Sequence, residues 1–452
     1  MTALNPSAAL DAAAQRSTVT LIGRRILPLI FIGYVIAYLD RVNIGYAQLE
    51  MGTALGIKAA AYGFAAAIFF IGYFFFEVPS NLMLRRFGAR IWITRIMITW
   101  GIVAMATGFV TNVEMLYVMR FLLGVAEAGF FPGMILYLTQ WFRAKDRSVA
   151  LGWFILAQPI AFIIGGLVGG VILDHVTWFG LAGWRWLFIL TGLPAVIVGL
   201  VNLVALPNSP QSARWLTPFQ ARWLSSTLSA EQGVAASHGV RAQLSALRER
   251  RVLHLAAIYL AAVTGANGFA LFLPLIVKQL NPTYSATNIG GVATIPFVAA
   301  AVMILVNARL SRAVRERKYY VIASVLVAAI GILLVITFRG SPLVAMVGLC
   351  LAGIGVFAYL PPFWTMATTG MSVTHAAVGV AAVNSIGNIG GFIGPYLVGQ
   401  GANSTGVTAG LFVPAASLLV AAVLLALWRS PARQPGSAEV APFTLDDAPT
   451  TS

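Results

Sequence analysis

Charged residues are scarce in this chain. Of its 452 residues only 10% are Asp, Glu, Lys or Arg, whereas 59% are hydrophobic. A soluble domain carries about 25% charged residues. Every water-soluble fold leaves part of its surface exposed, so it could not hide this much apolar surface. The composition therefore excludes a soluble protein and predicts that lipid surrounds most of the chain.

Cysteine is almost absent as well. The single cysteine, Cys350, lies inside an apolar run, so neither a disulfide within one chain nor a thiolate metal site is possible. The sequence also contains no metal-ligand spacing, nucleophile motif or cofactor-binding loop that we recognise. We therefore expect no metal, no cofactor and no enzymatic activity.

Long apolar runs, in contrast, recur along the whole chain. A helix of roughly 20 apolar residues crosses a hydrocarbon core of about 30 Å. The runs do not alternate in short segments as barrel strands do. They predict an all-α membrane protein with twelve transmembrane helices, at about 26–47, 62–84, 91–110, 114–138, 148–173, 184–206, 252–278, 287–309, 319–338, 343–367, 375–400 and 405–428.

The net charge of +15 is distributed unevenly across these helices. With twelve spans, most of the Lys and Arg residues fall in the tails and loops of one side. The opposite loops hold only Lys58, Arg185, Lys278 and Arg339. Such an excess of basic residues marks the cytoplasmic side of a membrane protein. Membrane topology therefore explains the positive charge better than nucleic-acid binding does. We predict a multi-pass protein of the bacterial inner (plasma) membrane with both termini cytoplasmic.

The chain has a weak twofold repeat. Shifted by 226 residues, the segment "IGGLVGG" at 164–170 falls on "GGFIGPY" at 390–396, and glycines four residues apart in both segments allow close helix approach. A duplication of six helices explains this pattern and the long polar break at the midpoint. We predict two pseudo-symmetric six-helix bundles with these boundaries: tail 1–25, first bundle 26–206, cytoplasmic linker 207–250, second bundle 251–428 and tail 429–452.

A few charged residues lie deep within the predicted helices. An ionised group at the bilayer centre costs about 2.5–3.5 kcal/mol on insertion scales, so it persists where it is paired or faces a wet cavity. Asp40 and Glu127 are each about 21 Å from the same side of the membrane, and Arg120 lies two turns from Glu127 on nearly the same helix face. Adjacent Asp40 and Arg41 point about 100° apart.

This arrangement suits a transporter that couples an anion to protons. An arginine stays charged and binds a carboxylate with two donors. Burial favours the protonated form of a carboxylic acid, whereas a neighbouring arginine favours the ionised form. An anion that occupies the arginines would therefore make the acids take up protons. The alternative is that Asp40, Arg41, Arg120 and Glu127 form a structural ion-pair network.

Other polar and aromatic residues at membrane depth are candidates for the same cavity. Their side chains can bond hydroxyls or carboxylates or can stack, although ordinary packing would also explain each aromatic residue. Pro361 and Pro362 should break or kink the helix before Trp364. The candidates are Tyr38, Tyr73, Gln158, Asn267, Trp364, Asn384 and Asn388.

Four motifs resemble one transporter family. The segments "YLDRVNIGYA" (38–47), "EVPSNLMLRRFGAR" (77–90), "RFLLGVAEAGFFPG" (120–133) and "QWFRAKDR" (140–147) look like those of the anion:cation symporters of the major facilitator superfamily. These include transporters of phthalate, tartrate, hexonates and hexuronates, and the vesicular glutamate carriers. The resemblance covers about 20–430 and implies the twelve-helix fold of that superfamily.

The resemblance also implies residue roles. Asp40 and Glu127 match proton sites of the sugar-acid members, and Arg41 matches the arginine that holds the substrate carboxylate. Further residues match cavity positions, with Asn267 a looser match; they are Tyr38, Tyr73, Arg120, Gln158, Trp364 and Asn384. One departure stands out, because Arg85 replaces the acidic residue that usually precedes the arginine of the 2–3 loop.

We therefore predict a proton-coupled secondary transporter that imports a small organic anion, a mono- or dicarboxylate such as a sugar acid, tartrate or phthalate-like compound, by alternating access. Its partners would be this substrate, protons and the lipid bilayer, with no nucleic acid, and we expect a monomer. The alternative is an organic-anion exchanger or exporter of the same fold without proton coupling. Two cavity arginines argue against a cation-selective multidrug exporter, and no segment is long enough to add a signalling domain for a receptor.

Overall fold

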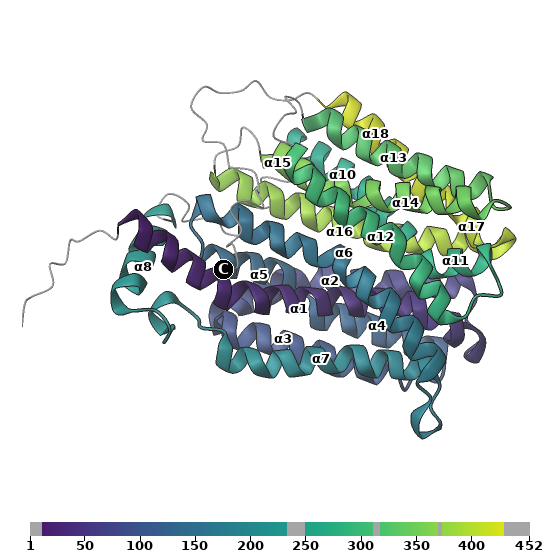
Figure 1. Cartoon of the computed structure of the whole chain (residues 1–452), viewed down its shortest axis with the longest axis horizontal. Coiled ribbons are helices and arrows are strands. Elements are labelled where there is room, and N and C mark those ends of the chain that lie inside the picture. The colour runs from purple at the N-terminus through teal and green to yellow at the C-terminus, as the bar shows by residue number, and fades with distance from the viewer. Residues whose placement is uncertain (1–10, 233–248, 311–316, 369–372, 429–452) are drawn as a thin grey trace, which may run out of the picture.

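The computed structural model describes residues 11–232, 249–310, 317–368 and 373–428, and it contains helices but no strand within those ranges. Most helices lie side by side along the long axis of the molecule (Figure 1). The first half contains α1 (Ala12–Ala54), α2 (Ala59–Phe87), α3 (Ala89–Thr107), α4 (Val113–Glu127), α5 (Phe130–Thr139), α6 (Ala144–His175) and α7 (Gly183–Ala205), with the short turn η1 (Trp178–Gly180) before α7. The turn η2 (Pro210–Ser212) and α8 (Pro218–Gln232) follow; the second half contains α10 (Arg250–Ala270), α11 (Leu273–Leu280), α12 (Ala286–Leu310), α13 (Arg317–Thr337), α14 (Pro342–Ala358), α15 (Leu360–Thr368), α16 (Val373–Thr405), α17 (Val407–Gly410) and α18 (Phe412–Leu427).

Each predicted apolar run coincides with helix. Eleven of the helical segments are long and apolar enough to cross a membrane, and α16 covers the remaining run at 375–400. Several spans consist of two consecutive helices, namely α4 with α5, α10 with α11, α14 with α15 and α17 with α18. The break before α15 falls at Tyr359, next to Pro361 and Pro362. The prediction of an all-α membrane protein with twelve transmembrane helices is confirmed.

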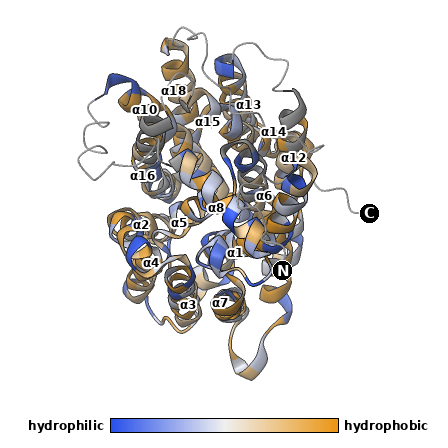
Figure 2. Ribbon diagram, turned by 90° about the vertical axis from the view of Figure 1, so that its left-hand side faces the viewer, coloured by the Kyte–Doolittle hydropathy of each residue, from blue (hydrophilic) through white to orange (hydrophobic). Residues whose placement is uncertain are grey.

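The molecule has two distinct ends. We call the end that carries the start of α1 and the helix α8 the linker end, at the left of Figure 1, and the opposite end, with α11 and α17, the distal end. Figure 2 looks along the helices from the linker end: α2, α3, α4 and α7 lie in its lower part, and α10, α13, α14 and α18 in its upper part. The two halves of the chain are therefore separate helix groups placed side by side.

Polar contacts join the two halves at the distal end. The Asp174 carboxylate, at the end of α6, accepts hydrogen bonds from the backbone N–H groups of Ala286 at 3.1 Å and Thr287 at 2.7 Å, at the start of α12. The Tyr62 hydroxyl on α2 donates to the Leu271 carbonyl at 2.5 Å, where α10 gives way to α11. These bonds satisfy backbone groups that helix ends leave without partners.

Glycines let the halves approach closely in the same region. A side chain at Gly290 on α12 would overlap the backbone of Gly166 on α6, and one at Gly63 on α2 would overlap Gly399 on α16. Small residues allow such backbone contact between membrane helices. The α6–α12 and α2–α16 pairs therefore form two tight seams between the halves.

The linker helix α8 packs against the linker end of the first half. The rings of Trp141 and Trp215 stack with centroids 5.7 Å apart, and the Arg143 guanidinium lies 5.1 Å from the ring centroid of Trp223 on α8. Arg143 also pairs with Asp146 at 2.6 Å and donates to Gln15 at 3.0 Å. This side of the linker is thereby attached to α1, α5 and α6.

Candidate functional site

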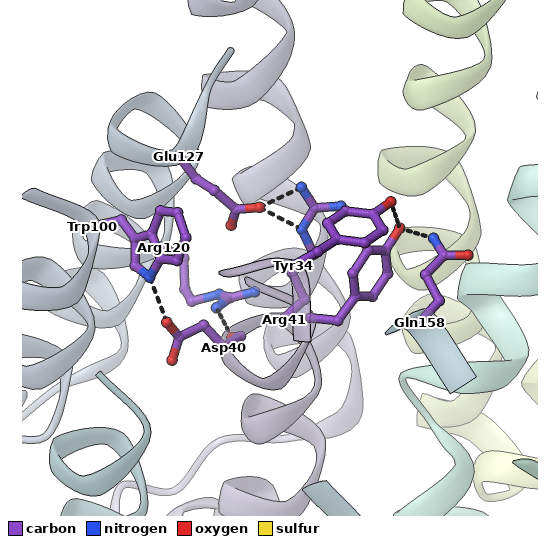
Figure 3. A network of polar contacts seen from close by, with 8 residues as sticks. Tyr34, Asp40, Arg41, Trp100, Arg120, Glu127 and Gln158 are labelled. Atoms are coloured by element: carbon purple, nitrogen blue, oxygen red, sulfur yellow. Dashed lines mark hydrogen bonds and ion pairs between the residues drawn. The ribbon is translucent and has the colours of Figure 1, made fainter. Parts of the chain in front are cut away.

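Asp40 and Arg41 are adjacent on α1 but their side chains point to different neighbours (Figure 3). The Asp40 carboxylate is completely buried and accepts a hydrogen bond from the Trp100 indole of α3 at 2.7 Å. It also accepts from the Asn43 amide at 3.4 Å, and this amide donates to Thr191 of α7 at 2.9 Å. Asp40 therefore lies in a polar cluster between α1, α3 and α7.

Arg41 points toward α4 and forms an ion pair with Glu127. Its Nε donates to Glu127 Oε1 at 2.9 Å, and its Nη2 donates to the same oxygen. The second carboxylate oxygen, Oε2, is buried and has no hydrogen-bond partner among the described residues. The pair thus uses one oxygen of the acid and is not the two-oxygen arrangement that gives arginine–carboxylate pairs their full strength.

The local fold at Glu127 explains its position. Glu127 is the last residue of α4, and the chain turns at Ala128 and Gly129 before α5 begins. Gly129 has φ +85°, and a side chain there would also collide with Ser80, so this turn requires glycine. A helix C-terminus bears partial negative charge, which disfavours a carboxylate. Arg41 supplies the opposing positive charge.

Three aromatic rings surround the Arg41 guanidinium. Its Cζ lies 4.9 Å from the ring centroid of Tyr38 and 5.2 Å from those of Phe69 and Tyr73. Cation–π contacts of this kind stabilise a cation by about 0.5–2 kcal/mol, more where water is excluded. The Arg41 side chain keeps 15% of its surface exposed whereas Glu127 is fully buried. Arg41 is therefore the accessible partner of the ion pair.

Arg120 is placed differently from Arg41. It is buried, with 1% of its surface exposed, and donates to the backbone carbonyls of Asp40 and Ala65, each at 3.4 Å. Its Cζ lies 5.3 Å from the ring centroid of Phe69, so this ring contacts both arginines. Arg120 thus links α4 to the backbones of α1 and α2, and these two hydrogen bonds go to carbonyls and not to carboxylates.

Tyr38 and Gln158 connect α1 to α6. The Gln158 amide donates to the Tyr38 hydroxyl, which also lies 3.5 Å from the Tyr34 hydroxyl. The Tyr38 ring is 6.2 Å from Phe162 of α6, and Phe162 lies 4.4 Å from Phe297 of α12. One stretch of α1 therefore brings together the candidates of the first half, namely Tyr38, Asp40, Arg41, Tyr73, Glu127 and Gln158.

The second-half candidates lie on α10, α15 and α16. Trp364 packs edge-on against Tyr259 of α10 with centroids 4.9 Å apart. The Asn267 amide donates to the Val263 carbonyl of its own helix at 3.2 Å. Asn384 and Asn388 are half-buried one turn apart on α16, and neither has a hydrogen bond among the described residues. Their role in substrate binding stays a prediction.

The two sets of candidates belong to opposite halves, and the α2–α16 seam relates their depths in the membrane. On the antiparallel α2–α16 seam, a side chain at Gly391 would meet Phe70. Stepping three residues along each helix from that contact brings Asn388 level with Tyr73. The Asn388 amide of the second half thus lies at the same depth as the aromatic rings that surround Arg41.

Sequence reasoning missed the partners of Asp40. Trp100 and Thr191 belong to helices far along the chain and looked like packing residues of apolar runs. Asn43 had a signal, because it lies three residues after Asp40 on the same helix face. Two of these partners, Asn43 and Thr191, line a cavity of about 140 Å³ between α1, α6 and α7.

Comparison with known proteins places this architecture in a family. The sequence pattern of the Major Facilitator Superfamily matches residues 30–395 and, in an overlapping match, residues 255–449. The chain belongs to the major facilitator superfamily. It is therefore a multi-pass membrane transport protein, and the ion pair and aromatic cage described above belong to a superfamily transporter.

Two transporters and one solved structure are similar to this chain over most of its length. A protein of Agrobacterium vitis named "Putative tartrate transporter" is 42% identical over 403 residues, which cover 88% of this chain and 88% of that protein. The "Quinolone resistance transporter" of Acinetobacter baumannii is 37% identical and covers 88% of this chain and 92% of its own. The crystal structure of a bacterial homolog of the lysosomal transporter Spinster, inward-facing and occupied, matches the fold with a TM-score of 0.70 at 16% identity, covering 89% of this chain and 96% of that one.

Proposed function

We propose that this protein imports a small organic anion together with protons by alternating access. The observation that carries the proposal is the Arg41 guanidinium, which is partly exposed, surrounded by three aromatic rings and paired with a buried acid. A guanidinium binds a carboxylate with two donors. The tartrate transporter name of the Agrobacterium vitis relative supports a carboxylate substrate.

The ion pair supplies a coupling mechanism. A substrate carboxylate on Arg41 competes with Glu127 for the same N–H groups. A displaced Glu127 would keep a negative charge at a helix C-terminus, with a buried oxygen that has no partner. Protonation removes this cost, so substrate binding and proton uptake favour each other. Asp40, beside Trp100 on the other face of α1, is the second proposed proton site.

The remaining candidates would orient the substrate. Tyr38 and Tyr73 border the Arg41 guanidinium, and Gln158 donates a hydrogen bond to Tyr38. Asn384 and Asn388 would contact the substrate from the second half, at a similar depth in the membrane. Asn267 and Trp364 would complete the second-half wall. Arg120 would act from behind Phe69, by holding the backbones of α1 and α2 in place.

The membrane orientation forms part of the proposal. We place the linker end, with both termini, in the cytoplasm of a bacterial inner membrane, because most basic loops lie at that end. The contacts of Asp174 and Tyr62 then close the outer side, and their release would open it. The rim of the outer opening would be the α6–α12 and α2–α16 seams.

Uptake into proteoliposomes tests the proposal. Purified protein should accumulate radiolabelled tartrate, or another anion from a panel of sugar acids and aromatic dicarboxylates, when the outside is made more acidic. Arg41→Lys should lose most uptake, because an ammonium cannot reproduce the planar donor pair. Arg339→Lys, at an exposed distal position, is the matched control and should transport normally. A Glu127→Gln or Asp40→Asn protein that still concentrates substrate against its gradient would refute the coupling.

A second candidate function follows from the quinolone resistance transporter of Acinetobacter baumannii. An exporter or an anion exchanger of the same fold would move substrate without a proton gradient. Counterflow measured with and without such a gradient separates the two: exchange that is insensitive to pH favours the exchanger, and uphill flux driven only by the gradient favours the symporter.

A further inference from the structure

A third carboxylic acid lies beside the Arg41 site. Glu77 is on α2, four residues and about one turn from Tyr73 toward the linker end. Only 6% of its surface is exposed, and its Oε2 is buried without a hydrogen-bond partner. No lysine or arginine of the described residues forms an ion pair with it. A buried carboxylate without a partner is costly, so the ionised form of Glu77 needs a cation nearby.

The Arg41 guanidinium is the cation near Glu77. It lies 5.2 Å from the ring centroid of Tyr73, the residue one turn away, and is within electrostatic range of Glu77. Glu77 and Glu127 therefore share one arginine, and only Glu127 bonds it directly. On the α2–α16 seam, seven residues from the contact of Phe70 with Gly391, Asn384 comes level with Glu77.

Within the described part of the chain, no residue of the helices packed against α2 forms an ion pair with Glu77. From α1 the charged neighbour is Arg41, and α16 contains no Asp, Glu, Lys or Arg at all. On α4, Arg120 and Glu127 bond other groups, and Glu114 and Tyr117 lie in the distal part of the helix. On α3, Arg90 donates to the Leu203 carbonyl, and the Arg95 guanidinium lies 4.0 Å from the ring centroid of Trp92. On α5, the Tyr137 hydroxyl donates to the Pro207 carbonyl.

Charge balance then sets the consequence. The group around Arg41 contains the carboxyls of Asp40, Glu77 and Glu127 and the guanidiniums of Arg41 and Arg120. With every group ionised it is already negative, and an anionic substrate makes it more so. Uncompensated charge at membrane depth is expensive, so protons must enter with the anion. A substrate that occupies Arg41 removes the counter-charge of Glu77 as well as that of Glu127.

We propose that Glu77 is a third proton-binding group of the transport cycle, loaded when a substrate carboxylate occupies Arg41. The inference rests on the proposed function, since it assigns one more proton to the same symport. It predicts that wild-type protein moves three protons with each anion, one each on Asp40, Glu77 and Glu127, and that Glu77→Gln moves two.

The reversal point of flux measures this number. Proteoliposomes hold tartrate tenfold more concentrated inside than outside, with the membrane potential clamped at zero by potassium and valinomycin. Each proton contributes about a factor of ten in concentration per pH unit. Net flux should vanish when the outside is more acidic by about 0.33 pH unit with three protons and about 0.5 with two. Glu77→Gln should therefore move the reversal point from the first value to the second.

Controls make each outcome decisive. Glu114→Gln, an exposed acid at the distal start of α4, should reverse where the wild type does, and so should Glu77→Asp, which keeps the carboxyl. A Glu77→Gln protein that reverses at the wild-type value overturns the inference, as does a wild type that reverses at 0.5 or beyond. Wild-type flux that ignores the pH gradient instead overturns the proposed function.

A binding measurement covers the case of a Glu77→Gln protein that folds but does not transport. Purified protein in weakly buffered detergent solution should take up protons when tartrate is added, as read by a pH indicator. Wild type should take up one proton per bound tartrate more than Glu77→Gln, and equal proton uptake by the two proteins contradicts the proposal.

Discussion

Replacing Asp174 with alanine should open the distal end. Its carboxylate accepts the N–H groups of Ala286 and Thr287, the first two residues of α12, from the end of α6 in the other half. The hydroxyl of Ser285 accepts a hydrogen bond from the next backbone N–H without a partner, that of Asn288, at 3.2 Å. Asp174 therefore caps a helix of the opposite half, and the cap exists only while the halves touch at this end.

The magnitude follows from capping energies. Loss of an N-terminal cap to alanine costs about 1 kcal/mol, within a range of about 0.5–2. In the open state the same N–H groups bind water, so the whole loss falls on the closed state. Since 1.4 kcal/mol is a factor of ten, Asp174→Ala should shift the equilibrium about fivefold toward an open distal end. Asp174→Asn should stay within about twofold of wild type, because asparagine caps as well as aspartate.

Spin labels report this equilibrium. With Cys350 replaced by serine, labels at Glu114→Cys in the first half and Arg339→Cys in the second lie at exposed distal positions. Pulsed electron–electron distance measurements then give the populations of short and long separations. Unchanged populations in Asp174→Ala would contradict the capping argument, and so would an Asp174→Asn protein that opens as far as the alanine variant.

Two further changes test neighbouring features. Gly290→Val should disfavour the closed distal end by roughly 1–3 kcal/mol, since a side chain there overlaps the Gly166 backbone; the same spin labels would show it, with Gly291→Val, which has open space, as the control. Trp100→Phe should lower the free energy of unfolding by about 1–3 kcal/mol, because the buried Asp40 carboxylate loses the hydrogen bond from the Trp100 indole at 2.7 Å. A second substitution, Asp40→Asn, should recover part of that loss in differential scanning fluorimetry, and a double variant as unstable as the sum of both would refute the assignment.

Much of the architecture was accessible from the sequence. Apolar runs predicted the twelve helices, because lipid leaves few other ways to satisfy a backbone. Asp40, Arg41, Arg120 and Glu127 were identified because a charge inside such a run is conspicuous. Their similar depth also follows from a rise of about 1.5 Å per residue.

The pairing of these charges was not accessible. The 100° between Asp40 and Arg41 showed that they diverge, but which one meets Glu127 depends on the rotation of α1 against α3, α4 and α7. The turn at Ala128 and Gly129 that ends α4 after Glu127 had no signal beyond a glycine. The Trp100 bond to Asp40 depends on tertiary packing, because tryptophan in an apolar helix usually only fills space.

The position of Arg120 bears on the speed of the proposed transport cycle. Because its guanidinium holds the main chains of α1 and α2 from α4, these three helices form a stiff frame around Arg41 and Glu127. Breaking and re-forming the ion pair then moves side chains alone, whereas alternating access would need whole bundles to rock, a motion that takes microseconds to milliseconds. In the proposed transport cycle, the substrate would then be bound within a frame that keeps its shape, and the rocking step would limit the rate.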